Sequence, residues 1–235
     1  MLDYLMYASS IIYLPFVYYS NYINTKNRNI IKKSNLIENL YVLWNIFLTI
    51  FSLWGTLNTI PYIYNKFQND KLLLTITDDD LWIYCYYPLK YFAASKILEL
   101  GDTVFLFLRG KQIRFIQYYH HLVTMLYCWY AHHRIEEGMN INLLFCSMNY
   151  SVHSVMYLWY TLSSLNYRTS SIVKNSITFL QNIQMVLGLY FIYIAQNFGK
   201  WYQYDFYGSI YATFMYFSYV LLFGYFLLSL KVKLR

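Results

Sequence analysis

The sequence has 235 residues, of which 58% are hydrophobic and 12% are charged, a composition too apolar for an ordinary soluble domain. Its net charge is +7, but the basic residues stand in short runs between apolar segments, which is typical of a polytopic membrane protein and argues against a nucleic-acid partner. The three cysteines, Cys85, Cys128 and Cys146, form neither a disulfide framework nor a metal-binding motif.

Seven apolar segments follow one another along the chain, each near the roughly 20 residues that an α-helix needs to cross a bilayer. They cover residues 4–24, 40–63, 85–108, 114–131, 140–163, 172–196 and 206–230. Because lipid offers no partner for an open backbone hydrogen bond, these segments must be helices. The sequence therefore predicts an all-α membrane protein with seven transmembrane helices in a single domain, residues 1–235. No Lys or Arg precedes the first apolar run, so we expect an uncleaved first span.

The segments between the spans predict the orientation of the protein. One side of the membrane receives most of the basic residues, namely Lys26, Arg28, Lys32, Lys33, Arg109, Lys111, Arg114, Arg168, Lys174, Lys231, Lys233 and Arg235. The other side holds the remaining loop cations beside most of the acidic loop residues, namely Lys66, Lys71, Arg134 and Lys200 with Asp70, Asp78, Asp79, Asp80, Glu136, Glu137 and Asp205. The positive-inside rule makes the first side cytosolic, with the N-terminus in the lumen and the C-terminus in the cytosol.

The last five residues, KVKLR, place Lys231 and Lys233 in the pattern K-x-K-x-x, which retrieves membrane proteins to the endoplasmic reticulum. A plain positive-inside flank explains the same lysines equally well. Both interpretations agree with a cytosolic C-terminus.

Charged residues occur inside the third apolar segment, where insertion scales give each a cost of about 2.5–3.5 kcal/mol at a helix centre. Lys96, Glu99 and Asp102 recur at i, i+3 and i+6, so they share a helix face and Lys96 can pair with Glu99. A structural ion pair between two spans would explain one lysine and one carboxylate, but it leaves the second carboxylate without a role. We therefore interpret these residues as part of a buried polar site.

Three more apolar segments carry polar residues at helical spacing. These residues are Gln117, His120 and His121 on the fourth segment, Asn149, His153, Tyr157 and Tyr160 on the fifth, and Thr178, Gln181 and Gln184 on the sixth. A rise of 1.5 Å per residue places all of them, with Lys96, Glu99 and Asp102, in the cytosolic half of the bilayer. A lone histidine on an apolar helix is more often a core residue than a catalyst. Agreement in depth among four helices instead favours one shared site.

The polar residues stand in the order and spacing of motifs of the ELO family, the membrane elongases of very-long-chain fatty acids, which the chain resembles over nearly its whole length. The matching motifs are Lys96-x-x-Glu99-x-x-Asp102-Thr103, Tyr119-His120-His121, Asn149-x-x-Val152-His153-x-x-Met156-Tyr157-x-x-Tyr160, Thr178-x-x-Gln181-x-x-Gln184 and Leu222-Phe223-x-x-Phe226. The stretches YHHLVTMLYCWY and VHSVMYLWYTL are most similar to members that extend saturated and monounsaturated chains. The chain departs from the family box H-x-x-H-H at Gln117, which can form hydrogen bonds but cannot titrate.

The resemblance implies the condensing enzyme of microsomal fatty acid elongation, a very-long-chain 3-oxoacyl-CoA synthase. Such an enzyme joins acyl-CoA to malonyl-CoA, releases CO2 and CoA, and lengthens the chain by two carbons. The resemblance also implies seven helices, of which spans two to seven enclose an acyl-chain tunnel. It implies no cofactor or metal beyond the substrates. The expected partners are membrane lipid, the reductases and dehydratase of the elongation cycle, and a second copy of the chain.

The expected roles follow from the chemistry of the side chains. His120 or His153 is the candidate nucleophile that forms an acyl-imidazole, with the other histidines, including His121, as base or orienting group. Lys96, Glu99 and Asp102 are expected to set histidine protonation and to position the CoA end. Hydrogen bonds to substrate are expected from Gln117, Asn149, Tyr157, Tyr160, Thr178, Gln181 and Gln184. Arg109, Lys111 and Arg114 are expected to meet CoA phosphates, although a solvated positive-inside turn explains them as well.

Two other classes of protein fit parts of the pattern. A di-iron membrane desaturase or hydroxylase would use paired histidines, but it needs more than the five of this chain, and His132 and His133 fall on the lumenal side. A seven-helix transporter or receptor would have a polar midplane, yet acidic and histidine side chains at one cytosolic depth fit a closed reaction chamber better. A cysteine-based condensing enzyme is less expected, because no cysteine lies in the polar motifs.

Overall fold

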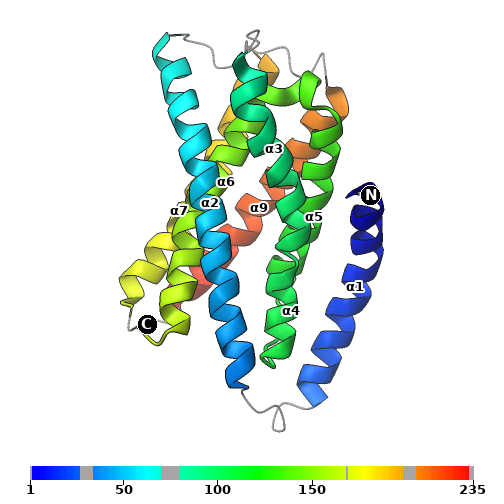
Figure 1. Ribbon diagram of the computed structural model, residues 1–235, viewed down its shortest axis with the longest axis vertical. Helices are drawn as coiled ribbons and strands as arrows, with labels where there is room; N and C mark the ends of the chain where they lie inside the picture. Colours follow the sequence, from blue (N-terminus) through cyan, green and yellow to red (C-terminus); the bar gives the residue numbers. More distant parts are fainter. Residues whose placement is uncertain (1, 27–33, 70–79, 168, 198–204, 233–235) are drawn as a thin grey trace.

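The computed structural model describes residues 2–26, 34–69, 80–167, 169–197 and 205–232. These residues are almost entirely helical, as predicted, and no strand occurs among them. The helices are α1 (Leu2–Lys26), α2 (Asn35–Asn69), α3 (Asp80–Leu98), α4 (Gly101–Leu108), α5 (Phe115–His133), α6 (Ile135–Ser164), α7 (Ser171–Asn197) and α9 (Phe206–Val232), as Figure 1 shows.

The third apolar segment is the one place where the prediction of a continuous helix was wrong. Its helix ends at Leu98 as α3, and α4 begins at Gly101. Between them the backbone tightens, because Leu100 N–H donates to the carbonyl of Ile97 and Asp102 N–H donates to that of Glu99. At Gly101 a Cβ atom would lie 2.7 Å from the indole of Trp44, so only glycine allows α2 to approach this closely.

In the part of the chain that the structure describes, three helices are long and apolar enough to cross a membrane, judged by length and composition. They are residues 35–65 of α2, all of α7, and residues 206–229 of α9. Large apolar side chains such as Leu57, Ile172 and Phe214 are exposed on the outer surface. Lipid accommodates such a surface and water does not, so the chain is a membrane protein.

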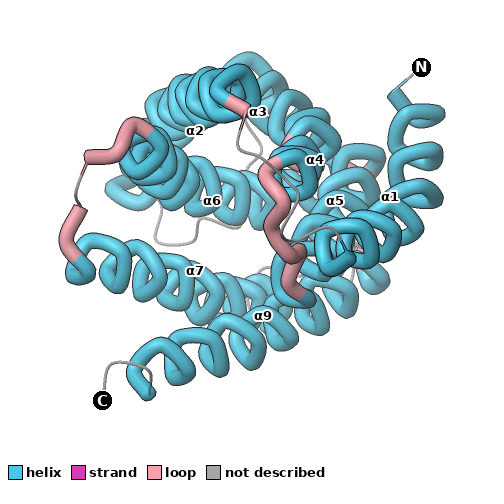
Figure 2. Tube along the Cα trace, turned by 90° about the horizontal axis from the view of Figure 1, so that it is seen from below, coloured by secondary structure: helices cyan, strands magenta, loops and turns pink. Residues whose placement is uncertain are grey.

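Six of the helices pack in a closed order around the interior of the protein. Going round, α2 packs on α3, α3 on α5, α5 on α9, α9 on α7, α7 on α6, and α6 returns to α2 (Figure 2). Helix α4 continues the line of α3, and α1 lies outside the ring against α3, α4 and α5 (Figures 1 and 2). The polar segments of the sequence therefore all belong to helices that face one interior.

About half of the loop residues that predicted the orientation lie outside the described residues. They include Arg28, Lys32, Lys33, Lys71, Arg168, Lys200, Lys233 and Arg235. The orientation and the K-x-K-x-x retrieval signal therefore stay predictions.

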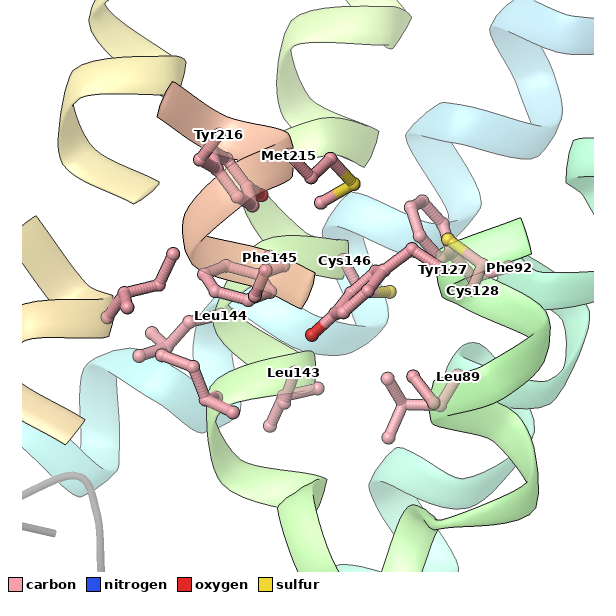
Figure 3. Close-up of a cluster of buried hydrophobic side chains, with 14 of the residues drawn as sticks. Leu89, Phe92, Tyr127, Cys128, Leu143, Leu144, Phe145, Cys146, Met215 and Tyr216 are labelled. Carbon is pink, nitrogen blue, oxygen red and sulfur yellow. The ribbon is translucent and has the colours of Figure 1, made fainter. Parts of the chain in front are cut away.

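Glycine residues let two of the helix pairs approach closely. A methyl group on Gly55 of α2 would overlap the ring of Tyr150 of α6, and one on Gly188 of α7 would overlap the ring of Tyr216 of α9. Tyr150 and Tyr216 are buried in the large apolar cluster that Figure 3 shows in part. The bulk of these rings thus sets the spacing of α2 from α6 and of α7 from α9.

We expect Gly55→Ala to lower the free energy of unfolding by about 1–3 kcal/mol, because the new methyl group forces α2 and α6 apart. Gly224→Ala is the matched control, since a Cβ atom there meets no atom within 4 Å. The control should be neutral or stabilising by up to about 1 kcal/mol, as alanine favours a helix over glycine. Thermal unfolding of the purified protein in detergent measures both variants. Equal unfolding temperatures for Gly55→Ala and Gly224→Ala would contradict the argument that Gly55 is needed for close packing of α2 on α6.

Candidate functional site

A wide cavity of about 890 Å³ lies inside the ring at the end where α4 turns into α5. It is lined by side chains from α1, α2, α4, α5, α6, α7 and α9 and from the turn between α4 and α5. The predicted site residues on its walls are Asp102, Arg109, Lys111, Arg114, Gln117, His120, His121, His153, Tyr157, Tyr160 and Gln181. The cavity therefore gathers groups that the sequence spreads over four apolar segments.

A narrower cavity, about 50 Å³ by the same measure, lies between α3, α5, α6, α7 and α9. Most of its lining is apolar and belongs to the cluster of Figure 3, including Leu89, Phe92, Cys128, Phe145, Met215 and Tyr216. Polar side chains contribute at His120, Asn149 and Gln184, and also at His132 and Asn142. Among the described residues, His120 is the one that lines both cavities.

A buried polar cluster joins α3 to α6. The Lys96 ammonium is 2.7 Å from Glu99 Oε1 and donates to Asn149 Oδ1 at 2.8 Å, although only 3% of Lys96 is exposed. It also lies 4.0 Å from the centre of the Phe92 ring. Asn149 in turn places its Nδ2 3.2 Å from Nε2 of His153. Lys96 thus links its own carboxylate partner to a histidine on another helix.

His153 is enclosed on several sides. Besides Asn149 at Nε2, it has Glu99 Oε1 at 3.9 Å from Nδ1, and the ring of Tyr157 packs edge-on at 5.4 Å between centroids. Since the residue is buried, these neighbours leave the imidazole little freedom to rotate. The sequence predicted the pairing of Lys96 with Glu99, and the structure adds His153 to that pair.

His120 has a different environment, dominated by aromatic rings of α9. Its ring lies 4.7 Å from that of Tyr219 and 5.6 Å from that of Phe223, measured between centroids. The hydroxyl of Tyr219 bonds with Thr124 Oγ1 and donates to the backbone carbonyl of His120. His120 Nδ1 is buried and has no hydrogen-bond partner within the described part of the chain. The imidazole is therefore held mainly by packing against aromatic rings.

Asp102 forms a network that the sequence did not indicate. Trp44 of α2 donates its indole N–H to Oδ1 at 2.7 Å, and Tyr157 of α6 donates its hydroxyl to Oδ2 at 2.8 Å. Both carboxyl oxygens thus bind a neighbouring helix, so Asp102 is not a simple continuation of the Lys96–Glu99 pair. Sequence reasoning missed Trp44, because a tryptophan near the end of an apolar span is typical of the aromatic belt.

The three polar residues predicted on the sixth apolar segment, now part of α7, lie in different places. Gln181 Nε2 lies 3.2 Å from Met156 Sδ on the wall of the wide cavity, and Gln184 is buried beside the narrow one. Thr178 is buried too, but its hydroxyl donates to the carbonyl of Lys174 and it lines neither of the two cavities. Thr178 is therefore the predicted substrate-binding residue that the structure does not bring into the site.

The basic residues at the wide cavity differ in their partners. Arg109 Nε donates to Glu38 Oε1 at 3.0 Å, and its guanidinium stacks over the Tyr41 ring. Arg114 lies over the Phe226 ring at 5.7 Å. Lys111, with these two arginines, lines the cavity and places positive charge at its edge.

Comparison with known proteins gives one consistent result. A model of the GNS1/SUR4 family, also called ELO, matches residues 3–232. Very long chain fatty acid elongase 6 of Rattus norvegicus is 34% identical over 200 residues, covering 79% of this chain and 70% of the relative. The Homo sapiens elongase 6 is 33% identical over 198 residues with the same coverage. Fatty acid elongase 3 of Trypanosoma brucei brucei is 34% identical over 183 residues, covering 63% of this chain and 57% of the relative. The chain belongs to the ELO family.

Membership of the ELO family confirms the resemblance seen in the ordered motifs and makes the chain an enzyme of fatty acid elongation. Most of the predicted site residues of this ELO-family chain line the wide cavity, the narrow cavity or the buried Lys96–Glu99 cluster, and Thr178 is the predicted site residue that does not. Gln117, which replaces the first histidine of the family box, lies on the wall of the wide cavity. The substituted position therefore still faces the site.

The five histidines of the ELO-family chain divide into two groups. His120, His121 and His153 line the wide cavity, whereas His132 and His133 lie at the far end of α5, where His133 Nε2 is 3.0 Å from Asp3 Oδ1. Across the described ranges, no three His, Cys, Asp or Glu side chains converge as the ligands of one metal ion would. The histidine pairs of the sequence thus belong to opposite ends of one helix.

We expect Trp44→Phe to lower the free energy of unfolding by about 1–3 kcal/mol, because it leaves one partly buried oxygen of Asp102 without its donor. Trp54→Phe on the same helix is the control, since Trp54 is 37% exposed and lies on the outer surface. Thermal unfolding in detergent compares the two variants. A loss of stability in the control as large as that in Trp44→Phe would show that ring size, and not the hydrogen bond, matters.

Proposed function

We propose that this ELO-family enzyme catalyses the condensing step of fatty acid elongation, joining a long-chain acyl-CoA to malonyl-CoA to give a 3-oxoacyl-CoA two carbons longer. The observation that carries the proposal is the position of His120 between the wide polar cavity and the narrow apolar one. An acyl-CoA with its chain in the narrow cavity and its CoA moiety in the wide cavity has its thioester at His120. In this proposal the chain crosses the membrane seven times, and the narrow cavity is the start of the acyl-chain tunnel.

The first chemical step uses a ring nitrogen of His120 as the nucleophile, because His120 lies where the two cavities meet. That nitrogen attacks the thioester carbon, the C–S bond breaks, and CoA leaves as a thiol with the imidazole proton. The product of this half-reaction is an acyl-imidazole at His120. No metal or cofactor takes part in the step.

The second step forms the new carbon–carbon bond. Malonyl-CoA loses CO2, and the resulting enolate carbon attacks the acyl carbon held by His120. The C–N bond breaks, the imidazole takes up one proton from solvent water, and 3-oxoacyl-CoA is released. Asn149, Gln181 and Gln184 supply hydrogen-bond donors for the thioester and enolate oxygens.

His153 acts in this proposal as base or orienting group, because Asn149, Glu99 and Tyr157 hold its ring. The buried Lys96–Glu99 pair fixes Asn149 and His153 relative to each other. His121 and Gln117, on the walls of the wide cavity, orient the substrate or the other histidines. Arg109, Lys111 and Arg114 bind the CoA phosphates as charged donors.

We place the enzyme in the endoplasmic reticulum membrane, with the wide cavity toward the cytosol and the narrow one toward the lumen. The positive-inside bias of the loops and the K-x-K-x-x pattern support this orientation. Its proposed partners are the reductases and the dehydratase of the elongation cycle, because the 3-oxo group of the product requires reduction, dehydration and a further reduction. A second copy of the chain is also a proposed partner.

An assay of the purified protein with a long-chain acyl-CoA and labelled malonyl-CoA tests the proposal. We expect release of labelled CO2 and a 3-oxoacyl-CoA two carbons longer, each requiring both substrates. Desaturated or hydroxylated product together with stoichiometric iron would instead support the di-iron alternative. Absence of any product would favour a transporter. Expression in cells that lack their own elongase, followed by fatty acid profiling, gives the preferred chain length.

We expect Ala131→Leu to shift the products toward shorter chains, because Ala131 is buried and lines the narrow cavity. The added carbons of leucine fill space that the acyl chain would occupy. Ala8→Leu is the matched control, since Ala8 is exposed on α1 outside the ring. Chromatography of the products compares the two, and an unchanged length distribution in Ala131→Leu would argue against an acyl chain in this cavity.

A further inference from the structure

Helix α1 lies outside the six-helix ring, yet its end at residues 21–25 reaches the wide cavity. Asn24 and Thr25 are among the residues that line it. Deeper in the membrane, α1 is fastened to α4 by a 2.8 Å hydrogen bond between Tyr13 and Thr103. A helix that only covered the ring would need no polar contact with the cavity wall.

The turn that α1 reaches is residues 109–114, which carries three of the basic residues of the wide cavity. Gly110 has a φ of 66°, and it closes α4 in a Schellman motif: Gly110 N–H donates to Phe107 O and Lys111 N–H donates to Leu106 O. The backbone thus returns sharply while Arg109, Lys111 and Arg114 remain close in sequence. Glu38 pairs with Arg109 at one end of this turn, and hydrogen bonds from another helix fasten the rest of it in place.

Helix α1 supplies that fastening through side-chain amides. Asn21 makes a pair of bonds with the backbone of Ile113, accepting from its N–H at 2.8 Å and donating to its carbonyl at 3.0 Å. Asn24 Nδ2 donates to the carbonyls of Phe107 and Lys111 at 3.3 and 2.9 Å. These bonds connect residues more than 80 positions apart in the sequence.

A second set of contacts comes from the turn itself. The amide of Gln112 donates to the carbonyl of Asn21 at 3.3 Å and to Thr25 Oγ1 at 3.0 Å. Asn24 is 1% exposed, and its Oδ1 is buried with no hydrogen-bond partner in the described ranges. This leaves an acceptor atom unused on a residue of the cavity wall.

The chemistry of the fastening matters as much as its geometry. The side-chain groups of α1 that bind the turn are neutral amides and a hydroxyl, so they order the backbone without adding negative charge. A carboxylate in the same place would pair with Lys111 or Arg114 and would repel a phosphate. Amides add no negative charge to the cavity wall beside these basic residues.

We propose that residues Asn21–Thr25 of α1 are a brace that preorganises the basic turn for the phosphates of CoA. The inference rests on the proposed function and extends it, because it makes Asn21 and Asn24 positioning residues for substrate binding. Preorganisation reduces the entropy lost when a flexible loop closes on its ligand, so the brace acts on binding of the nucleotide end and not on the chemical step.

The test compares a substrate that has the phosphates with one that lacks them. Asn21→Ala removes both bonds to Ile113, so we expect the KM for acyl-CoA to rise about tenfold with kcat within about twofold. With acyl-pantetheine, which has the thioester but no nucleotide, the KM should equal that of the wild type. Calorimetric binding of free CoA should weaken by the same factor. Asn58→Ala is the matched control, because Asn58 is exposed on α2 and its amide donates to the Trp54 carbonyl of the same helix.

Equal KM effects on acyl-CoA and acyl-pantetheine, or no effect on either, would overturn the brace. Lys111→Ala tests the basic turn itself. This variant should weaken CoA binding whether or not α1 preorganises the turn, so it distinguishes failure of the brace from failure of the proposed function. If the wild type neither binds CoA nor forms product, both proposals fail. If Asn21→Ala does not yield folded protein, Thr25→Val replaces it in the same comparison. This variant removes one hydrogen bond from Gln112 at an exposed position, so we expect a smaller rise in the KM for acyl-CoA.

Discussion

Replacing His120 with alanine is expected to abolish condensation, lowering turnover on the order of 10³-fold or more, as loss of a nucleophile does in enzymes that form covalent intermediates. The reason is its position at the meeting of the two cavities, with a buried ring nitrogen that has no partner in the described part of the molecule. His133→Ala is the matched control, because His133 is half exposed and lies at the far end of the same helix.

The measurement that identifies the nucleophile omits malonyl-CoA. Wild-type enzyme mixed with acyl-CoA alone should release free CoA in a burst equal to the enzyme concentration, since the acyl group stays on the imidazole. His120→Ala should show no burst, whereas His153→Ala should retain it and fail in the second step. A burst of CoA that persists in His120→Ala and disappears in His153→Ala would show that His153, and not His120, is the nucleophile.

The second large effect concerns stability. Glu99→Ala should lower the free energy of unfolding by about 3–5 kcal/mol, because it leaves the ammonium of Lys96 buried without its carboxylate. Lys96 is 3% exposed, so water cannot replace the lost partner. The double variant Lys96→Met/Glu99→Leu removes both charges and should be more stable than Glu99→Ala alone.

A control for the buried pair is available at the edge of the wide cavity. Glu38 binds Arg109 at 3.0 Å, but 28% of its side chain is exposed. Glu38→Ala should therefore cost less than Glu99→Ala, because this pair is partly exposed and the Arg109 guanidinium keeps its contact with the Tyr41 ring. Thermal unfolding in detergent measures all three variants. If Glu99→Ala and Glu38→Ala lose the same stability, burial is not what makes the Lys96–Glu99 pair important.

The positions of the helices were predictable because they depend on local properties of the chain. An apolar run of about 20 residues must satisfy its backbone within itself in lipid, so a helix forms wherever such a run occurs. The one error, at Glu99–Leu100, comes from tertiary contact. The indole of Trp44 lies against Gly101, and no spacing within the third segment indicates that approach.

The identity of most site residues was also predictable, because polar groups are expensive at membrane depth and therefore mark a site. Lys96, Glu99, His120 and His153 were selected in this way, and the structure brings them to one region of the interior. Thr178 met the same criterion and lies elsewhere, because a threonine can satisfy its hydroxyl on its own helix.

The sequence by itself determined that this protein is helical, that it lies in a membrane, and which residues form its polar motifs. Only the tertiary structure decided that Lys96 meets Asn149, that Trp44 binds Asp102, and that α1 binds the turn at Ile113. The physical reason is that helical spacing specifies which residues share a face, whereas the face that a helix turns toward its neighbour depends on side-chain shape along both helices. Those shapes are distributed over the whole chain, and the close packing at Gly55 and Gly188 shows how small the tolerance is.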